Sequence, residues 1–595
     1  MNIFRNGEEV TLGVFQVGRG KAKALQVNYV TDKENSGIIL YDKHTKEELG
    51  RFPFEENEDD NIRKLTIPQY SLNQISYLFY EEGKLVIDKN ALAFDGTDDY
   101  GSAKNVHKYR AIVPVEEYDW EGDLCPRLSS KESIVYCMHV RGFTMHDSSN
   151  VKGKGTFAGI IEKLPYLKSL GITTLELQPA YEFPEYQISY MDHFTSDTSP
   201  RGKLNYWGYT EGFYYTPKRA YSHTANPVTE FKDFVKALHQ NKMELIMQFY
   251  FPDNFPVTEI SSVLYFWHKE YHVDGFHLKG NNLPVTSIAT HPNFYHVKLM
   301  YESFEADKLK HISVKQRSNL VLYNDSYKRN MRSFLKSDYG TLLPAMRCMF
   351  ESNRLNNVSV VNFMSNYSGF TMWDMVCYQE KHNEDNGEDN RDGSDYNLTW
   401  NCGAEGPCYK IEVQVLRERQ LRNAFALLFL SQGIPLIFMG DEFGNTQNGN
   451  NNPYCQDNEI TWLDWNELKS HEGLHAYVKQ LINLRRNNTV FSVPQDQSQA
   501  HTTGFPSVSY HGLEAWKLSL DENSLHMGIL LNGHDCFWYI AINMHWEDQC
   551  LALPRVGKNM CWECILSTEG SVKEWTEQHQ VILGGRSITL FCARK

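Results

Sequence analysis

The chain has 595 residues, 41% hydrophobic and 22% charged, proportions that are ordinary for a folded protein of two to four domains. Its net charge of −15 disfavours nucleic acid and anionic membrane surfaces as partners, because neither would attract it electrostatically. Residues 1–10 are polar and charged, no run approaches the length of a membrane span, and the twelve cysteines are scattered. We therefore expect a reduced, cytoplasmic protein without a signal sequence.

Short strands separated by turns occupy the first part of the chain. Runs at 24–29, 37–41, 75–80 and 83–88 have strand length and composition, and helical periodicity is weak between them. Residues 1–120 are therefore predicted to form an N-terminal β-sandwich. The acidic stretch Glu55–Asp60 is predicted to be a solvated loop.

Strands and helices alternate from about residue 130. Four leucines and isoleucines from Ile160 to Leu170 lie at helical spacing before Gly171, a plausible C-cap. This alternation predicts an α/β domain over residues 121–500, a (β/α)₈ barrel with its chemistry at the carboxyl ends of the strands. A doubly wound open sheet is the structural alternative, but no glycine-rich dinucleotide fingerprint follows any strand. The predicted strands are 134–139, 172–177, 243–250, 273–278, 297–301, 358–363 and 435–439, and further predicted helices lie around 231–238 and 421–430.

Apolar strands return after residue 500, at 508–518, 537–544 and 587–592, and predict a C-terminal β-sandwich over residues 501–595. Cys561 and Cys564 have the spacing of a redox or zinc motif, but the stretch is β-rich and lacks a βαβ pattern. We expect neither a cofactor nor a bound metal.

Several motifs resemble glycoside hydrolase family 13, the α-amylase superfamily. Val273–Lys279 (VDGFHLK) resembles the family's fourth-strand motif VDGFRFD, in which the last Asp is the nucleophile. The longest polar strings are typical of the isoamylase, pullulanase and glycogen-debranching branch. The resemblance implies α-glucan as the partner and a starch-binding N-terminal domain. The segments that carry it are 136–144, 167–179, 205–209, 324–327 (interpreted as following the fifth strand), 381–393 with 400–407, and 440–465.

The family cleaves glycosidic bonds with a nucleophile, a general acid/base and a third carboxylate. Glu302 matches the general acid/base, on a fifth strand that resembles the family's. Lys279 replaces the nucleophile and Ser368 replaces the third carboxylate. An ammonium group cannot form the glycosyl ester of a retaining mechanism, so an inactive protein is favoured.

Other positions of the family's site also differ. His277 and Tyr367 stand where relatives have Arg and His, and Trp207 and Tyr209 resemble the loop whose ring stacks under the sugar; these four are candidate substrate-binding residues. The third strand has Gln248 through Asp253, in which Pro252 replaces an Asn that often helps relatives bind calcium, so no calcium is expected there. Asp274 has the opposite strand parity to Lys279 and is interpreted as a buried structural residue.

Three functions stay open. The first is an inactive debranching relative that binds glucan or acts as a partner of an active homologous debranching enzyme. The second is an active glucan hydrolase or transferase that uses Glu302 with carboxylates from elsewhere, such as Asp253 or the acidic loop 384–395. The third is a protein-interaction module without glucan binding. Lys279 and Glu302 are predicted to form an ion pair across the barrel mouth, because strands four and five are neighbours. An isolated, protonatable Glu302 would instead favour the second function.

Overall fold

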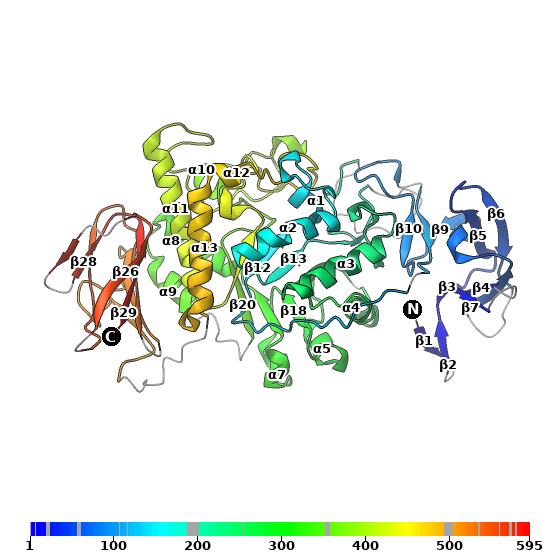
Figure 1. Cartoon of the computed structure of the whole chain (residues 1–595), viewed down its shortest axis with the longest axis horizontal. Helices are drawn as coiled ribbons and strands as arrows, with labels where there is room; N and C mark the ends of the chain where they lie inside the picture. The colour runs from blue at the N-terminus through cyan, green and yellow to red at the C-terminus, as the bar shows by residue number, and fades with distance from the viewer. Residues whose placement is uncertain are drawn as a thin grey trace.

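The computed structural model describes residues 2–5, 8–18, 24–55, 61–105, 108–115, 117–186, 202–253, 255–350, 358–492, 504–533, 536–557, 560–570, 574–576 and 580–594. The predicted acidic loop 55–60 falls outside these ranges except for Glu55. A central barrel is flanked by N-terminal strands on one side and C-terminal strands on the other (Figure 1). None of the described helices combines the length and apolar character that crossing a bilayer requires.

Eight parallel strands close into one barrel, which confirms the predicted (β/α)₈ architecture. One of them, β19, was not identified from the sequence. The segment that begins at Asn324 therefore follows the sixth strand, and its interpretation as following the fifth was wrong. In barrel order the strands are β12 (Val135–Met138), β13 (Thr174–Leu177), β16 (Glu244–Tyr250), β17 (Gly275–Lys279), β18 (Lys298–Tyr301), β19 (Leu320–Tyr323), β20 (Ser359–Phe363) and β21 (Ile434–Phe438).

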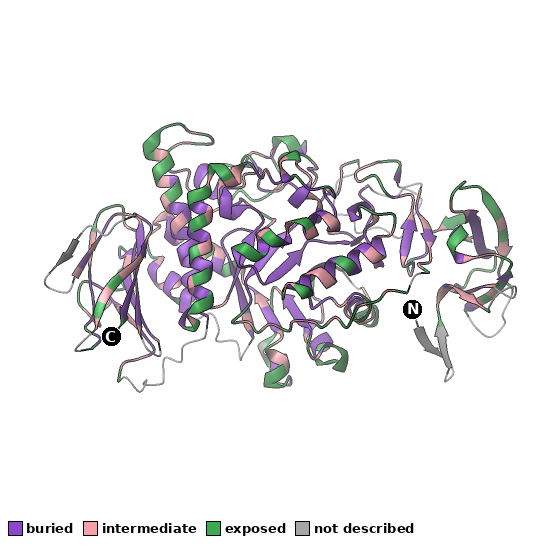
Figure 2. Ribbon diagram, in the orientation of Figure 1, coloured by how far each residue is buried: buried purple, intermediate pink, exposed green. Residues whose placement is uncertain are grey.

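Helices cover the outside of the barrel, with their buried residues toward the strands and exposed residues toward solvent (Figure 2). The predicted helix at 160–170 is confirmed; Gly171 ends it with a φ of 101°, a conformation that glycine adopts without strain. The helices are α1 (Val140–Thr144), α2 (Phe157–Leu170), α3 (Pro227–Gln240), α4 (Val257–Glu270), α5 (Val285–Thr290), α6 (Ala306–Leu309), α7 (Val314–Arg317), α8 (Asp325–Lys336), α9 (Leu342–Phe350), α10 (Asp374–Cys377), α11 (Ile411–Leu430), α12 (Glu467–Ser470) and α13 (Glu472–Asn487).

The N-terminal strands form a six-stranded and a three-stranded sheet that share one apolar core, beside a short β1–β2 hairpin. Val27 of the smaller sheet and Phe79 of the larger one are both fully buried in that core. The strands are β1 (Asn2–Arg5), β2 (Glu8–Thr11), β3 (Gly13–Val17), β4 (Ala24–Val30), β5 (Ser36–Asp42), β6 (Glu48–Pro53), β7 (Ile62–Pro68), β8 (Ile75–Glu81), β9 (Lys84–Val86), β10 (Ala93–Asp95) and β11 (Arg110–Ile112).

The C-terminal strands form a five-stranded and a three-stranded sheet around a second apolar core. The strand predicted at 508–518 is shorter than expected, because the chain turns after His511 and Gly512 N–H donates to the Lys517 carbonyl at 2.8 Å. The strands are β22 (Val508–His511), β23 (His526–Asn532), β24 (Phe537–Asn543), β25 (Gln549–Ala552), β26 (Cys561–Ser567), β27 (Glu574–Thr576), β28 (Gln580–Leu583) and β29 (Ser587–Arg594).

A buried ion triad supports the loop that follows the second barrel strand. Lys218 Nζ lies 3.0 Å from Glu182 Oε1 and 2.6 Å from Glu185 Oε1, and the three side chains are at most 2% exposed. The lysine follows β15 (Phe213–Pro217), which pairs with β14 (Tyr181–Glu182). Burial opposes its charge, but Glu182 and Glu185 outweigh this effect and raise the pKa of Lys218. The triad therefore joins the end of β15 to β14 and to the chain that follows β14.

Replacing Lys218 with Met is expected to destabilise the protein by about 3–5 kcal/mol, because two buried carboxylates lose their counter-ion. The measurement is the midpoint of thermal unfolding by calorimetry. Lys517→Met is the matched control, since Lys517 forms an exposed pair with Glu514 at 3.2 Å and such pairs contribute less than about 1 kcal/mol. Equal midpoints for the two variants would contradict a structural role for the triad.

Candidate functional site

The residues that the resemblance matches to the family's catalytic positions lie where three barrel strands end. Lys279 is the last residue of β17, Glu302 directly follows β18, and Tyr367 and Ser368 come shortly after β20. Because the strands are parallel, these ends share the carboxyl face of the barrel, where barrel enzymes carry their chemistry.

The predicted ion pair between neighbouring strands is confirmed. Lys279 Nζ lies 3.0 Å from Glu302 Oε1. The ammonium group also lies over two tyrosine rings, 4.9 Å from the centroid of Tyr323 and 5.6 Å from that of Tyr367, an arrangement that favours a cation. Burial works against the charge, but Tyr367 and Glu302 outweigh it and raise the pKa of Lys279. Lys279 is therefore held as a cation at the position that the resemblance matches to the family's nucleophile.

Glu302 is held as an anion. The charge of Lys279 is the main reason that the pKa of Glu302 lies below its usual range. The direction is opposite to the raised pKa that a general acid needs near neutral pH. Its side chain is 65% exposed, so solvent can reach the carboxylate.

His277 and Tyr209 belong to a buried hydrogen-bond network centred on Glu176, a residue of β13 that the sequence analysis did not single out. Glu176 Oε1 lies 2.5 Å from His277 Nδ1 and 2.6 Å from Gln248 Nε2, which donates to it. Tyr209 Oη donates to Gln248 Oε1. Burial, assisted by the charge of Lys279, lowers the pKa of His277, whose side chain is fully buried. His277 and Tyr209 therefore both take part in hydrogen bonds within the protein.

Three aromatic rings form the wall of the barrel mouth. The ring centroids of Tyr209 and Tyr367 lie 5.0 Å apart, and that of Trp207 lies 5.4 Å from Tyr367. All three side chains are partly exposed. Gly208 holds the loop in place with a φ of 80°, and a Cβ there would come within 2.5 Å of the Phe183 ring.

The remaining predicted positions separate into exposed and buried ones. Ser368 is exposed, and its backbone N–H donates to Asn366 Oδ1 at 3.1 Å. Asp253 is exposed as well. Asp274 is buried at the opposite end of β17 and accepts from Leu245 N–H at 2.8 Å, which confirms its interpretation as structural.

The polar strings at 381–393 and 449–458 form one lattice of amide side chains. Asn383 Nδ2 donates to Asn451 Oδ1 at 2.9 Å, and Asn450 Nδ2 and Gln456 Nε2 both donate to Asn386 Oδ1 at 2.9 Å. The Tyr454 carbonyl in turn accepts from the backbone N–H of Tyr206 at 2.8 Å. The lattice therefore holds the loop that carries Trp207 and Tyr209.

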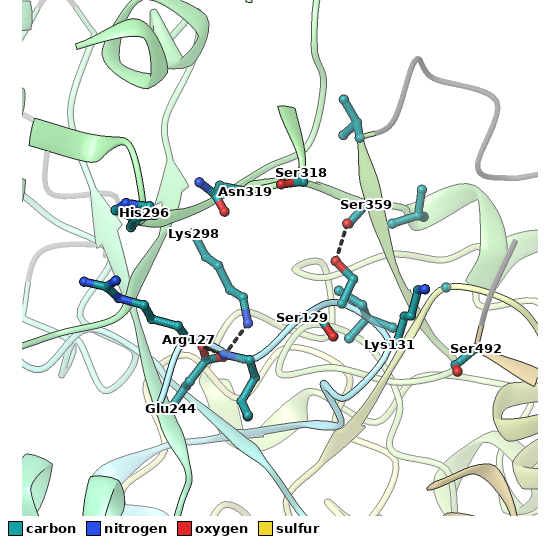
Figure 3. A pocket seen from close by; sticks show the side chains of 16 residues that line it. Arg127, Ser129, Lys131, Glu244, His296, Lys298, Ser318, Asn319, Ser359 and Ser492 are labelled. Carbon is teal, nitrogen blue, oxygen red and sulfur yellow. Dashed lines mark hydrogen bonds and ion pairs between the residues drawn. The ribbon is translucent and has the colours of Figure 1, made fainter. Parts of the chain in front are cut away.

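Figure 3 shows a cavity of about 500 Å³ whose lining includes residues from the amino ends of barrel strands. Its lining includes Lys298 at the start of β18 and Glu244 at the start of β16, which form an ion pair. Glu244 and Lys298 lie at the amino ends of their strands, whereas Lys279 and Glu302 lie at the carboxyl ends. The cavity is therefore separate from the residues matched to the catalytic positions.

Comparisons with known proteins agree with this geometry. Residues 143–253 match the alpha amylase catalytic domain. The chain is 30% identical to chloroplastic isoamylase SU1 of Zea mays, over 82% of this chain and 72% of that protein. It is 32% identical to chloroplastic isoamylase 1 of Oryza sativa, over 63% of this chain and 57% of that relative's length.

The pullulanase of Paenibacillus barengoltzii, solved in complex with maltohexaose and alpha-cyclodextrin, has the same fold. Its TM-score is 0.72 at 18% identity, over 98% of this chain and 95% of that one. The chain therefore belongs to the isoamylase and glycogen-debranching branch of glycoside hydrolase family 13.

Glu302→Gln is expected to lower the thermal midpoint slightly at pH 6–7 and not at all well below pH 4. A carboxylate whose pKa is depressed in the folded state contributes stability above its unfolded pKa, and loses it as pH falls through the folded value. Because Glu302 is largely exposed, the effect stays below about 1 kcal/mol. The measurement is calorimetry of both proteins between pH 3 and 7. A midpoint difference that persists unchanged at pH 3 counts against the ion pair as its source.

Proposed function

We propose that this chain is a member of the debranching branch that does not hydrolyse glucan and that acts by binding glucan or as a partner of an active homologous debranching enzyme. The observation that carries the proposal is the 3.0 Å ion pair of Lys279 with Glu302. Its cytoplasmic location stays a prediction from the sequence.

The chemistry of a retaining glycosidase explains why this pair argues against hydrolysis. Cleavage needs a carboxylate nucleophile and a protonated carboxyl group about 5–5.5 Å apart. Here Lys279 offers no oxygen to capture the sugar, and its charge would repel the developing oxocarbenium ion. The same charge keeps Glu302 ionised, so the leaving-group oxygen has no proton donor at this position. Losing two such functions removes most of the transition-state stabilisation.

Glucan binding rests on the wall formed by Trp207, Tyr209 and Tyr367. Apolar ring faces suit the C–H faces of sugars, and the rings are partly open to solvent. The pullulanase of the same fold was solved with maltohexaose, and the relatives named above are isoamylases. These facts support an α-glucan as the partner.

An active enzyme that recruits other carboxylates is less well supported. Asp392 of the acidic loop accepts from Asn386 at 2.8 Å and from Asn452 at 2.9 Å, so its Oδ2 serves the amide lattice. Glu388 lies 3.2 Å from Lys203 Nζ. Asp253 is exposed, and no hydrogen bond or ion pair among the described residues ties it to Glu302. An interaction module without glucan binding is favoured only by the hydrogen bonds that His277 and Tyr209 make within the protein. The next experiment distinguishes this alternative from a glucan-binding protein.

The unaltered chain is expected to be retarded in gels containing glycogen or amylopectin and to release reducing ends from neither. Trp207→Ala should weaken retardation about fivefold, since a ring contact contributes about 1 kcal/mol. Trp546→Ala is the control, because that tryptophan is 52% exposed in the C-terminal domain. Absence of retardation would favour the interaction module, and robust release of reducing ends would overturn the proposal of inactivity.

Restoring both carboxylates, Lys279→Asp with Ser368→Asp, is expected to leave debranching of pullulan and amylopectin near background. His277 and Gln248 stay tied to Glu176, and Tyr367 stays where relatives have His, while catalytic groups that act as a unit are strongly non-additive. Retained glucan binding serves as the control for folding. A double variant with ordinary debranching rates would show that the surrounding site had remained competent.

A further inference from the structure

A cysteine, a histidine and an aspartate from three distant segments meet at the base of the barrel. Cys125 lies in the segment that leads into the first barrel strand, His239 in the last turn of α3, and Asp274 directly before β17. Their possible ligand atoms all lie within 4.8 Å of one another. His239 and Asp274 are buried and Cys125 is partly buried. The group is separate from the proposed glucan site, because five residues of strand, about 16 Å, separate Asp274 from Lys279.

The histidine is oriented in the way that metal-binding histidines are. Its Nδ1 lies 2.7 Å from Asp123 Oδ2, and its Nε2 faces the cluster, 3.0 Å from Asp274 Oδ2. A carboxylate on the far ring nitrogen fixes the tautomer and raises the basicity of the ligand nitrogen. Asp123 is itself held by His272 Nδ1 at 2.8 Å, and the His272 ring stacks on Trp120 with centroids 3.8 Å apart.

The aspartate has a free coordination position. Asp274 is 5% exposed, and its Oδ2 accepts from Leu245 N–H at 2.8 Å while it faces His239. Its other oxygen, Oδ1, is buried and has no hydrogen-bond partner among the described residues. A buried carboxylate oxygen without a partner is costly and needs an explanation.

A charged histidine between two aspartates accounts for part of this arrangement. It satisfies both ring nitrogens and one oxygen of each carboxylate. It leaves Asp274 Oδ1 without a hydrogen-bond partner among the described residues. The Cys125 thiol lies beside the Asp274 carboxylate and makes a long contact of 3.8 Å with the His272 carbonyl. A metal ion would take both Asp274 Oδ1 and the Cys125 sulfur as ligands.

We propose that Cys125, His239 and Asp274 bind one divalent transition-metal ion, zinc in preference to others. Sulfur, nitrogen and oxygen ligands together suit zinc, whereas calcium and magnesium require oxygen ligands alone. On binding, the Cys125 thiol and His239 Nε2 each release a proton to solvent, and Asp274 coordinates as the carboxylate it already is. His239 Nδ1 keeps its proton and donates it to Asp123. Water or another ligand completes the four-coordinate shell.

The proposed ion would fasten the segment around Cys125 to α3 and β17 across the base of the barrel. That segment leads from the N-terminal domain into the barrel, and the base is the face that serves stability in this architecture. The expected consequence is a metal-dependent rise in thermal midpoint, since a ligand that binds the folded state alone stabilises it.

The test uses the full chain, freed of metal with a chelator and titrated with Co²⁺ and then Zn²⁺. We expect one Co²⁺ per chain, a near-ultraviolet thiolate-to-cobalt absorption, its loss on adding Zn²⁺, and a higher thermal midpoint with Zn²⁺. Cys125→Ser should abolish the absorption and weaken Zn²⁺ binding at least about tenfold. Cys561→Ser, which removes an exposed cysteine of β26, should change neither.

Asp123→Asn is the second variant, because it leaves the three ligands in place and removes only the group that orients His239. It should weaken Zn²⁺ binding about 10–100-fold while keeping the cobalt–thiolate absorption at saturating Co²⁺. The proposal is overturned if the unaltered chain shows no such absorption, if Cys125→Ser retains it, or if Asp123→Asn binds Zn²⁺ as tightly as the unaltered chain.

Discussion

The closure of eight parallel strands into one barrel is the constraint on which the rest of the structure depends. Successive side chains of a strand point to opposite faces, and hydrogen bonding between neighbours fixes which residues meet. β17 pairs in register with β18, so Lys279 at the end of one strand lies beside Glu302 at the end of the next. The ion pair follows from the topology together with the exchange of a carboxylate for an ammonium group.

The departures from the family's pattern fit one another electrostatically. An inward-facing histidine on β17 is fully buried, and the Glu176 carboxylate on β13 supplies its acceptor. Gln248 donates to the same carboxylate oxygen, Oε1, and accepts a hydrogen bond from Tyr209 Oη. Lys279 is balanced by Glu302 and by two tyrosine rings. Replacing Glu176 alone would leave His277 Nδ1 and Gln248 Nε2 without this buried acceptor.

The sequence predicted the parts that repeat and missed the parts that depend on distant segments. Apolar runs such as 134–139 and 243–250 identify barrel strands because they are buried on both faces. Strand β19 was not predicted, because its apolar run is only four residues long and has polar residues on both sides. Glu176 could have been identified from the sequence, because it is the one charged residue in a strand that otherwise contains only Thr and Leu. The Cys125 cluster could not, because its three members lie in unrelated segments.

The longest polar strings have a structural role that does not depend on the positions matched to the family's catalytic residues. Each amide of the lattice serves several partners: Asn386 accepts from both Asn450 and Gln456, and it donates to the Asn452 carbonyl at 2.9 Å. Removing one side chain would leave more than one buried group unsatisfied, at about 1–3 kcal/mol for each. Ser368 has no comparable set of partners, because it is exposed and its backbone N–H donates to Asn366 Oδ1. Stability therefore restrains the lattice independently of any catalytic role.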